Sequence, residues 1–214
     1  MRVAIIGPGS IGSVLAKRLV LAGHEVRLSF GRDADKLRNI ADALGVGHGA
    51  PGEVARWSDV IALTTPWSVL DEVAAALGDL SGKIVWDNSN AISPDLSAML
   101  IGTTTSVGEE VQKRFPGARV VKCIPTFAEL LAADDPTVNG LPVTAYLAGD
   151  DATAKAAVSA LLTDLPTKPI DVGDLIVSRL IEPMMLLLVQ LAYLRGLGPA
   201  ISFNLVQREG SVHG

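Results

Sequence analysis

The chain of 214 residues is long enough for one domain with a sizeable core, and 49% of its residues are hydrophobic. Its formal net charge of −5, with no cluster of Lys and Arg, argues against nucleic acid as a partner. The single cysteine, Cys123, excludes an internal disulfide, and no signal-like segment precedes the first predicted strand, so we expect a cytoplasmic protein.

The first predicted strand, residues 2–6, is followed by a glycine turn and then by a helix that ends near residue 22. Residues 7–12 read G-P-G-S-I-G, the G-x-G-x-x-G pattern between a buried strand and an amphipathic helix. In this pattern the first glycine permits the tight turn, the second lets a pyrophosphate approach the backbone, and the third allows close helix packing. The helix N-terminus presents its amides to the phosphates. We therefore predict a dinucleotide site whose first residues are Gly7, Gly9, Ser10 and Ile11.

The second predicted strand, residues 25–30, ends where NAD-binding relatives of this unit carry an acidic residue for the ribose. Ser29 and Phe30 stand there instead, and Arg32 follows on the loop, where a guanidinium can bind a 2′-phosphate in a two-pronged contact. The missing carboxylate and the nearby cation favour NADP, with Ser29 and Arg32 as phosphate ligands.

Two alternatives remain open at this strand end. Arg32 can be a solvated loop residue while Asp33 caps the next helix, or Asp33 can bind the ribose, which would restore NAD. Phe30 can pack against the adenine or belong to the core at the end of the strand.

Apolar runs and helical patterns continue to alternate along the chain. Further strands are expected near Val46 and over residues 60–63, 84–86, 119–124, 143–147 and 168–172. Further helices are expected over residues 34–44, 69–77, 107–115, 151–162 and 174–194. This order predicts an α/β fold, a doubly wound Rossmann-type sheet that is mostly parallel and has helices on both faces. We assign residues 1–173 to the dinucleotide-binding domain and residues 174–214 to a C-terminal helical extension packed on it.

The most hydrophobic stretch, residues 180–194, lies in the last predicted helix. It is shorter than the roughly 20 residues of a membrane span, and it contains Glu182, Pro183 and Gln190. We therefore expect no membrane insertion, and a helix that belongs to the core or to a subunit interface. By hypothesis its apolar face joins two subunits in a homodimer.

Other reactive residue types have plainer interpretations. Cys123 ends a buried strand with no histidine nearby in sequence, which favours a small core residue over a nucleophile. The three histidines have no ligand spacing, so we predict no metal site. Arg179 and Glu182 lie one helical turn apart and are expected to pair with each other.

Polar residues follow the strand over residues 84–86. Asp87, Asn88 and Asn90 can reach the nicotinamide amide or a substrate, or they can bond to their own backbone, as Asp and Asn commonly do in turns.

Two later motifs indicate a family. Residues 63–67 read L-T-T-P-W at the end of a strand, and residues 171–182 contain D-x-G, then S-R at 178–179 and Glu182. With the glycine turn, this series resembles the deazaflavin-dependent NADP oxidoreductases. Their relatives include the reductase domains of ferric reductases and the N-terminal domain of pyrroline-5-carboxylate reductase. The resemblance covers nearly the whole chain.

The resemblance implies hydride transfer between NADPH and a flat acceptor, such as a deazaflavin or flavin, without metal or nucleophile. It implies a path from adenosine to nicotinamide lined by Thr64, Thr65, Pro66 and Trp67, although Trp67 can equally be a core anchor. It also places Ile124 and Pro125 in a loop beside the nicotinamide. The chain departs from the family where Phe30 and Gly31 precede a single Arg32. It departs again where Lys122-Cys123 replaces the His-Thr of relatives with a deazaflavin partner.

We therefore expect an NADP(H)-dependent oxidoreductase that acts on a small-molecule or cofactor acceptor. Only about forty residues follow the last predicted strand, so the site is expected to be shallow, which suits a flat acceptor. No residue is singled out as catalytic, because the transfer depends on positioning. The alternative is an NADP-binding sensor or accessory module without turnover.

Overall fold

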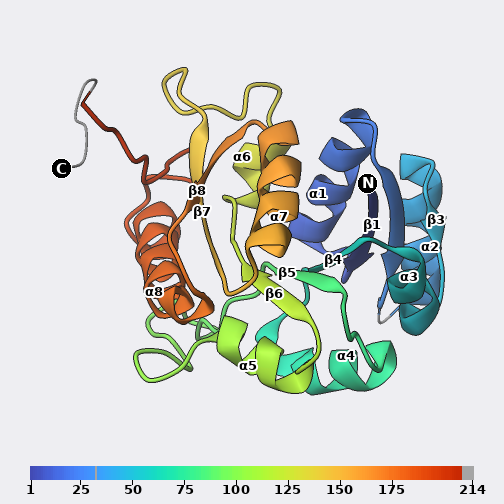
Figure 1. Cartoon of the computed structure of the whole chain (residues 1–214). Coiled ribbons are helices and arrows are strands. Elements are labelled where there is room, and N and C mark those ends of the chain that lie inside the picture. The colour runs from blue at the N-terminus through green and yellow to red at the C-terminus, as the bar shows by residue number, and fades with distance from the viewer. Residues whose placement is uncertain (32, 209–214) are drawn as a thin grey trace.

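The computed structural model describes residues 1–31 and 33–208, which form one eight-stranded sheet with helices packed on it (Figure 1). The strand order is β3-β2-β1-β4-β5-β6-β7-β8; β6 and β7 run antiparallel and the other neighbouring pairs run parallel. The predicted Rossmann-type α/β fold is confirmed. The strands are β1 (Arg2–Ile6), β2 (Glu25–Ser29), β3 (Gly47–His48), β4 (Val60–Leu63), β5 (Ile84–Asp87), β6 (Arg119–Lys122), β7 (Val143–Gly149) and β8 (Thr167–Asp171).

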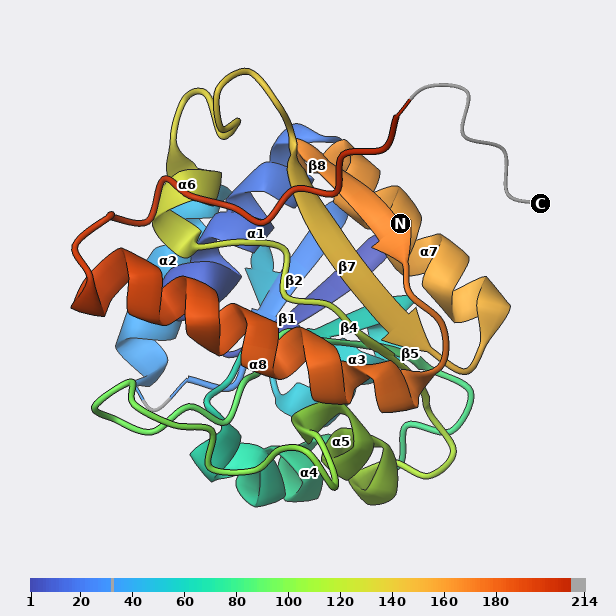
Figure 2. The ribbon, with the colours of Figure 1, turned by 90° about the vertical axis from the view of Figure 1, so that its left-hand side faces the viewer.

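Two layers of helices cover the sheet, because successive side chains of its buried strands point to opposite faces. On β1, Val3 and Ile5 pack into the core beneath α1, α2 and α7, whereas Ala4 and Ile6 pack into the core beneath α3, α4 and α5. Figure 2 shows α1 and α7 above the sheet and α4 and α5 below it. The helices are α1 (Ser10–Leu21), α2 (Ala34–Leu44), α3 (Pro51–Trp57), α4 (Leu70–Leu77), α5 (Val107–Arg114), α6 (Ala128–Ala132), α7 (Ala152–Asp164) and α8 (Ser178–Val189).

The last predicted helix is present in three consecutive pieces. A 3-10 turn, η2 (Leu175–Val177), leads into α8, and a π-helical segment, η3 (Gln190–Leu194), follows it. α8 crosses in front of β7 and joins a third hydrophobic cluster with α6 and the start of β7 (Figure 2). The extension therefore packs on the sheet domain, whereas its division from that domain at residue 174 stays a proposal.

Two short helices were not expected from the sequence. α3 begins at Pro51, a residue well suited to the first position of a helix, and buries Val54 and Ala55. α6 has five residues and buries Leu130 and Leu131. Both are shorter than the window over which helical periodicity becomes visible in a sequence, so packing rather than pattern determines them.

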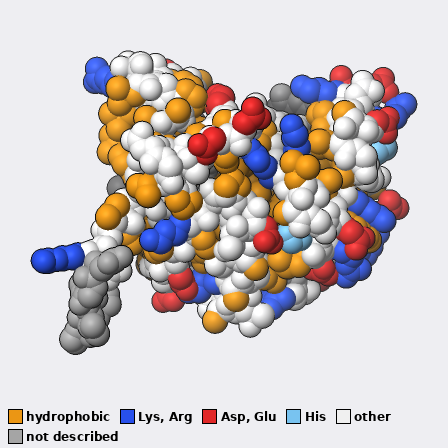
Figure 3. Space-filling model, turned by 90° about the horizontal axis from the view of Figure 1, so that it is seen from above, with side chains coloured by type: hydrophobic (Ala, Val, Ile, Leu, Met, Phe, Trp, Pro, Cys, Tyr) orange, Lys and Arg blue, Asp and Glu red, His pale blue; other side chains and the backbone are white. Residues whose placement is uncertain are grey.

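The helical stretch Leu175–Leu194 is 20 residues long with a mean hydropathy of 1.8, so by length and composition alone it could cross a membrane. Its Glu182, however, is 1% exposed and bound to groups of the sheet domain, and 39% of the stretch is buried against the rest of the chain. The remaining apolar surface faces outward. Figure 3 shows hydrophobic side chains gathered on the side where α8 lies, while on the same face Lys and Arg are interspersed with Asp and Glu.

Candidate functional site

A cavity of about 480 Å³ lies at the carboxyl ends of β1, β2 and β4. In this strand order β2 and β3 lie on one side of β1, and β4 and the later strands lie on the other side. Open α/β sheets bind their ligands at such switch points. The lining residues come from the glycine turn, the end of β2, α2 and the loop after β4: Gly7, Pro8, Gly9, Phe30, Gly31, Asp33, Lys36, Leu37, Ile40, Thr64, Thr65, Pro66 and Val69.

The glycine turn has the geometry that its pattern predicts. Gly7 has φ +93°, and a Cβ there would lie 2.5 Å from the Thr65 methyl carbon. A Cβ on Gly12 would lie 2.5 Å from the Gly7 carbonyl oxygen and 2.6 Å from Thr64 Oγ1. A Cβ on Gly9 would meet no described atom within 4 Å. The first and third glycines are thus required by the fold, while the space over Gly9 is left open beside the cavity.

Thr64 holds this turn in place. Its Oγ1 is within hydrogen-bond distance of two carbonyl oxygens and can donate to either, that of Gly7 at 2.7 Å or that of Ile6 at 3.0 Å. The backbone N–H of Gly7 donates to the Ser29 carbonyl at 2.9 Å, and that of Gly9 to the Gly7 carbonyl at 2.7 Å. The turn is therefore fixed from both neighbouring strands before any ligand arrives.

The N-terminus of α1 faces outward behind Gly9, its N-cap residue, and no described side chain caps it. First-turn amides lack intrahelical acceptors, so those of Ser10 and Ile11 are available as anion donors, reinforced by the helix dipole. Neither residue is part of the cavity lining, and each would act through its main chain.

At the end of β2 the structure corrects one predicted ligand. Ser29 is fully buried, and its hydroxyl donates to the Gly49 carbonyl at 2.7 Å, so the hydroxyl proton is not directed at the cavity. Phe30, with φ +60°, packs against the core, as one alternative predicted, and it also lines the cavity, so its contact with adenine stays a prediction. Arg32 lies outside the described residues.

Asp33 is the cap of α2, as one alternative predicted. Its carboxylate accepts from the backbone N–H groups of Asp35 at 2.9 Å and Lys36 at 3.0 Å. Asp33 and Lys36 both border the cavity. Lys36 is therefore a described cation next to the place where the sequence expects a 2′-phosphate.

The loop after β4 divides into lining and supporting residues. Thr64, Thr65 and Pro66 line the cavity, whereas Trp67 does not. Trp67 packs against the core beneath α4, and the Arg114 guanidinium lies 5.5 Å from its ring centroid. The core-anchor alternative describes Trp67 correctly.

Ile124 and Pro125, predicted beside the nicotinamide, do not line this cavity. They follow β6 and border a second, smaller cavity against β7 and α8. The structure therefore brings the residues expected at the phosphates close to those of the β4 loop, and it places the expected nicotinamide loop at a separate opening.

A buried ionic cluster at the ends of β5 and β6 was missed in the sequence. Lys122 Nζ lies 2.9 Å from Asp87 Oδ2 and 3.1 Å from Glu182 Oε1, and it also donates to the Ser89 carbonyl. All three charged residues are at most 1% exposed. Burial alone would lower the pKa of the Lys122 ammonium, but the two carboxylates outweigh burial and raise that pKa. The only sequence signal was the Lys at the position where relatives carry His.

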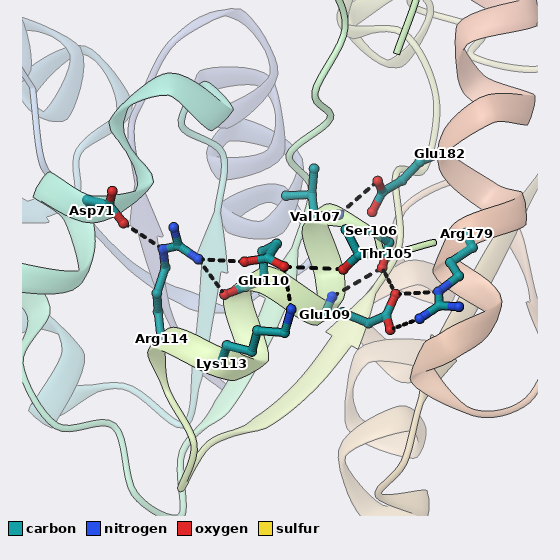
Figure 4. A network of polar contacts seen from close by, with 10 residues as sticks. All are labelled: Asp71, Thr105, Ser106, Val107, Glu109, Glu110, Lys113, Arg114, Arg179 and Glu182. Atoms are coloured by element: carbon teal, nitrogen blue, oxygen red, sulfur yellow. Dashed lines mark hydrogen bonds and ion pairs between the residues drawn. The ribbon is translucent and has the colours of Figure 1, made fainter. Parts of the chain in front are cut away.

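The predicted pair between Arg179 and Glu182 is wrong. Arg179 instead forms a two-pronged contact with Glu109, at 2.8 and 2.6 Å, and this bond lowers the pKa of Glu109 (Figure 4). Glu182 turns to the N-terminus of α5 and accepts from the backbone N–H groups of Val107 and Gly108, at 2.9 and 3.1 Å. A carboxylate that accepts from the amides of a helix N-terminus is stabilised more than one in an exposed ion pair on its own helix. Glu182 therefore binds the N-terminus of α5 and does not pair with Arg179.

The sequence contained a signal for the start of α5. Residues 106–109 read S-V-G-E, the pattern of a capping box, and Ser106 Oγ accepts from Glu109 N–H at 3.2 Å and donates to the Glu109 carboxylate at 2.8 Å. Cys123 is fully buried, and burial raises the pKa of its thiol, as expected for a core residue. Among the residues that the structure describes, no group of three or more His, Cys, Asp and Glu could hold a metal.

The fold and the cavity define a Rossmann-type dinucleotide-binding protein. Residues 2–91 match the family model described as NADP oxidoreductase coenzyme F420-dependent, so this part of the chain is similar to that family. The match confirms the resemblance found in the sequence, and with it the class of NADP-dependent oxidoreductase and the cofactor NADP.

Solved structures agree over the whole chain. A candidate F420-dependent NADP-reductase from Arthrobacter sp. FB24 is 27% identical with a TM-score of 0.85, over 97% of this chain and all of that one. A hypothetical protein from Sinorhizobium meliloti is 28% identical with a TM-score of 0.77, over 97% and 96% of the two chains. An imine reductase from Pseudomonas sp., 20% identical with a TM-score of 0.65, shares the fold over 91% of this chain and 64% of its own.

Proposed function

We propose that the 480 Å³ cavity binds the adenosine and pyrophosphate part of NADP(H), and that the chain transfers hydride between the nicotinamide and a flat acceptor such as a deazaflavin or flavin. The observation that carries the proposal is the open space over Gly9 beside the uncapped N-terminus of α1. A pyrophosphate fits there because the amides of Ser10 and Ile11 lie together and no side chain of the turn blocks their approach.

The remaining contacts of the nucleotide follow from the lining. Phe30 offers a ring face to the adenine, and Lys36 with Arg32 supplies positive charge for the 2′-phosphate. Thr65 and Pro66 border the way from the pyrophosphate toward the ends of β5 and β6. When bound, the nicotinamide supplies the hydride chemistry itself, and the chain contributes binding, orientation and exclusion of water.

The decisive experiment measures oxidation of NADPH and NADH by a deazaflavin, by FMN and by a ferric chelate. We expect turnover with a flat ring and a KM for NADPH well below that for NADH, because only NADPH carries the 2′-phosphate. Arg32→Ala should raise the KM for NADPH and leave that for NADH unchanged. Tight NADPH binding without turnover on any acceptor would favour the alternative, a sensor or accessory module. Equal KM values for both nucleotides would contradict the phosphate site.

We also propose that the outward face of α8 joins two copies of the chain. Ile176, Leu180, Leu187 and Leu194 recur at intervals of four and seven along one stretch, and each is at least half exposed. A stripe of this kind is typical of helix pairing between subunits.

Leu180→Glu combined with Leu187→Glu is expected to convert a dimer into a monomer, because both charges would be buried in the interface. Elution volume and sedimentation at micromolar concentration measure the change. Leu21→Glu, at a 70% exposed leucine on α1, is the matched control and should remain dimeric. A wild-type chain that is already monomeric would contradict the proposed interface and leave the nucleotide site untouched.

A further inference from the structure

The loop between α6 and β7 contains a two-residue turn formed by Asn139 and Gly140. The flanking residues pair in both directions: Val138 N–H donates to the Leu141 carbonyl at 2.9 Å, and Leu141 N–H donates to the Val138 carbonyl at 3.1 Å. Asn139 and Gly140 have φ +53° and +73°, the pattern of a type I′ turn, which the sequence Asn-Gly favours. Figure 2 shows this loop projecting beyond α6 at the top of the molecule.

The groups with which an Asn-Gly pair can react internally are free in this turn. Both residues are exposed, and within the described chain neither the Asn139 side chain nor the Gly140 N–H takes part in a hydrogen bond. A Cβ at Gly140 would meet no described atom within 4 Å, so nothing crowds the approach of the Gly140 nitrogen to the Asn139 side chain. The peptide between the two residues can therefore rotate while the ends of the turn stay paired.

The other four asparagines lack this combination. Asn39 lies inside α2, and Asn88 is 7% exposed. The side-chain amides of Asn90 and Asn204 are each hydrogen-bonded to a backbone group. None of the four is followed by glycine, the residue whose missing side chain leaves its nitrogen least hindered. Sequence and structure therefore single out the same asparagine.

We propose that Asn139 is a site of spontaneous deamidation, at which the ageing chain acquires an isoaspartate. Asparagine is among the thermolabile residues of proteins. The Gly140 nitrogen attacks Asn139 Cγ, a C–N bond forms, and the side-chain nitrogen leaves as ammonia, which gives a cyclic succinimide. Water then breaks one of the two ring C–N bonds. Breaking the bond to Cγ leaves aspartate, and breaking the bond to the backbone carbonyl carbon leaves isoaspartate.

Isoaspartate opens the turn, whereas aspartate retains it. Isoaspartate adds one methylene to the main chain, so the two bonds between Val138 and Leu141 no longer enclose a two-residue loop of type I′ geometry. Val138 packs against the third hydrophobic cluster, which α6, α8 and the start of β7 share. Formation of isoaspartate therefore weakens the packing of these elements on one another.

The conversion is measured by ageing the purified chain in mildly alkaline buffer, followed by tryptic digestion and mass spectrometry. Cleavage after Lys122 and Lys155 gives the peptide of residues 123–155, in which Asn139 is the only residue with a side-chain amide. This peptide should change from the mass of an amide to that of an acid before the peptides of the other four asparagines do. An isoaspartyl methyltransferase should label it. Fresh protein digested in the same way gives the baseline.

Asn139→Gly is the matched control, because Gly-Gly also favours the type I′ turn but has no side chain to cyclise. Fully converted wild type should have a Tm roughly 2–4 °C below that of fresh wild type, as expected for the loss of about one hydrogen bond. Aged Asn139→Gly should keep its initial Tm. Fresh Asn139→Asp, which carries the charge without the extra methylene, should melt close to wild type.

Two results would overturn the inference. If the Asn139 peptide converts no faster than the peptides of the other four asparagines, the turn is not a deamidation site. If isoaspartate forms at Asn139 without any fall in Tm, the turn does not support the cluster of α6 and α8.

Discussion

Gly9→Ala is expected to reduce the affinity for NADPH at least tenfold, about 1.4 kcal/mol, while the chain still folds. A Cβ at this position meets no described atom within 4 Å, so the fold accommodates it. It would occupy the space in which the pyrophosphate must approach the amides of Ser10 and Ile11. Fluorescence titration with NADPH measures the loss, and urea unfolding should give a free energy within about 1 kcal/mol of wild type.

Gly12→Ala is the matched control in the same turn. Its Cβ would lie 2.5 Å from the Gly7 carbonyl oxygen and 2.6 Å from Thr64 Oγ1, so the overpacking should cost about 1–3 kcal/mol of stability. Binding and stability should therefore fall together in Gly12→Ala and separate in Gly9→Ala. Wild-type affinity in Gly9→Ala would show that the pyrophosphate does not bind at this turn.

The nucleotide half of the molecule was predictable because its signals are local. Two glycines of the turn are required by contacts within a few residues or with a nearby strand end: Gly7 by Thr65, and Gly12 by the Gly7 carbonyl. The strands form continuous apolar runs in the sequence because both faces of the sheet are covered.

Contacts that join distant parts of the chain were less predictable. The sequence predicts Ser29 as a phosphate ligand, whereas in the structure its hydroxyl donates a hydrogen bond to the Gly49 carbonyl. The sequence predicts Glu182 as a partner of Arg179, whereas in the structure Glu182 binds two backbone amides of α5 and the ammonium of Lys122 on β6. None of these partners is adjacent in sequence to the residue that it binds. Which partner a side chain takes depends on which contact gives the larger free-energy gain when it is buried.

The departure at residues 122–123 illustrates the same limit. In the sequence, Lys122-Cys123 in place of His-Thr bears on the identity of the acceptor. In the structure both residues are fully buried, and neither lines the 480 Å³ cavity or the cavity behind Ile124. Lys122 instead ties the ends of β5 and β6 to α8. The substitution therefore bears on how α8 is attached to the sheet.

Lys122→Met is expected to lower the free energy of unfolding by about 3–5 kcal/mol near neutral pH, because it leaves the carboxylates of Asp87 and Glu182 buried without their cation. Urea unfolding at neutral pH measures the loss. Arg2→Met, which removes a pair with Asp59 whose side chains are 47% and 43% exposed, should cost no more than about 1 kcal/mol.

Neutral substitutions at the two carboxylates separate the charge from the packing. Adding Asp87→Asn and Glu182→Gln to Lys122→Met removes every buried charge of the cluster, and part of the lost stability should return. The side-chain amide introduced by Glu182→Gln still offers one oxygen to the N-terminus of α5, so the contact between α8 and α5 is retained in part. If Lys122→Met alone were as stable as wild type at neutral pH, the carboxylates would not depend on the ammonium. The attachment of α8 would then have to come from its apolar contacts with β7 and α6.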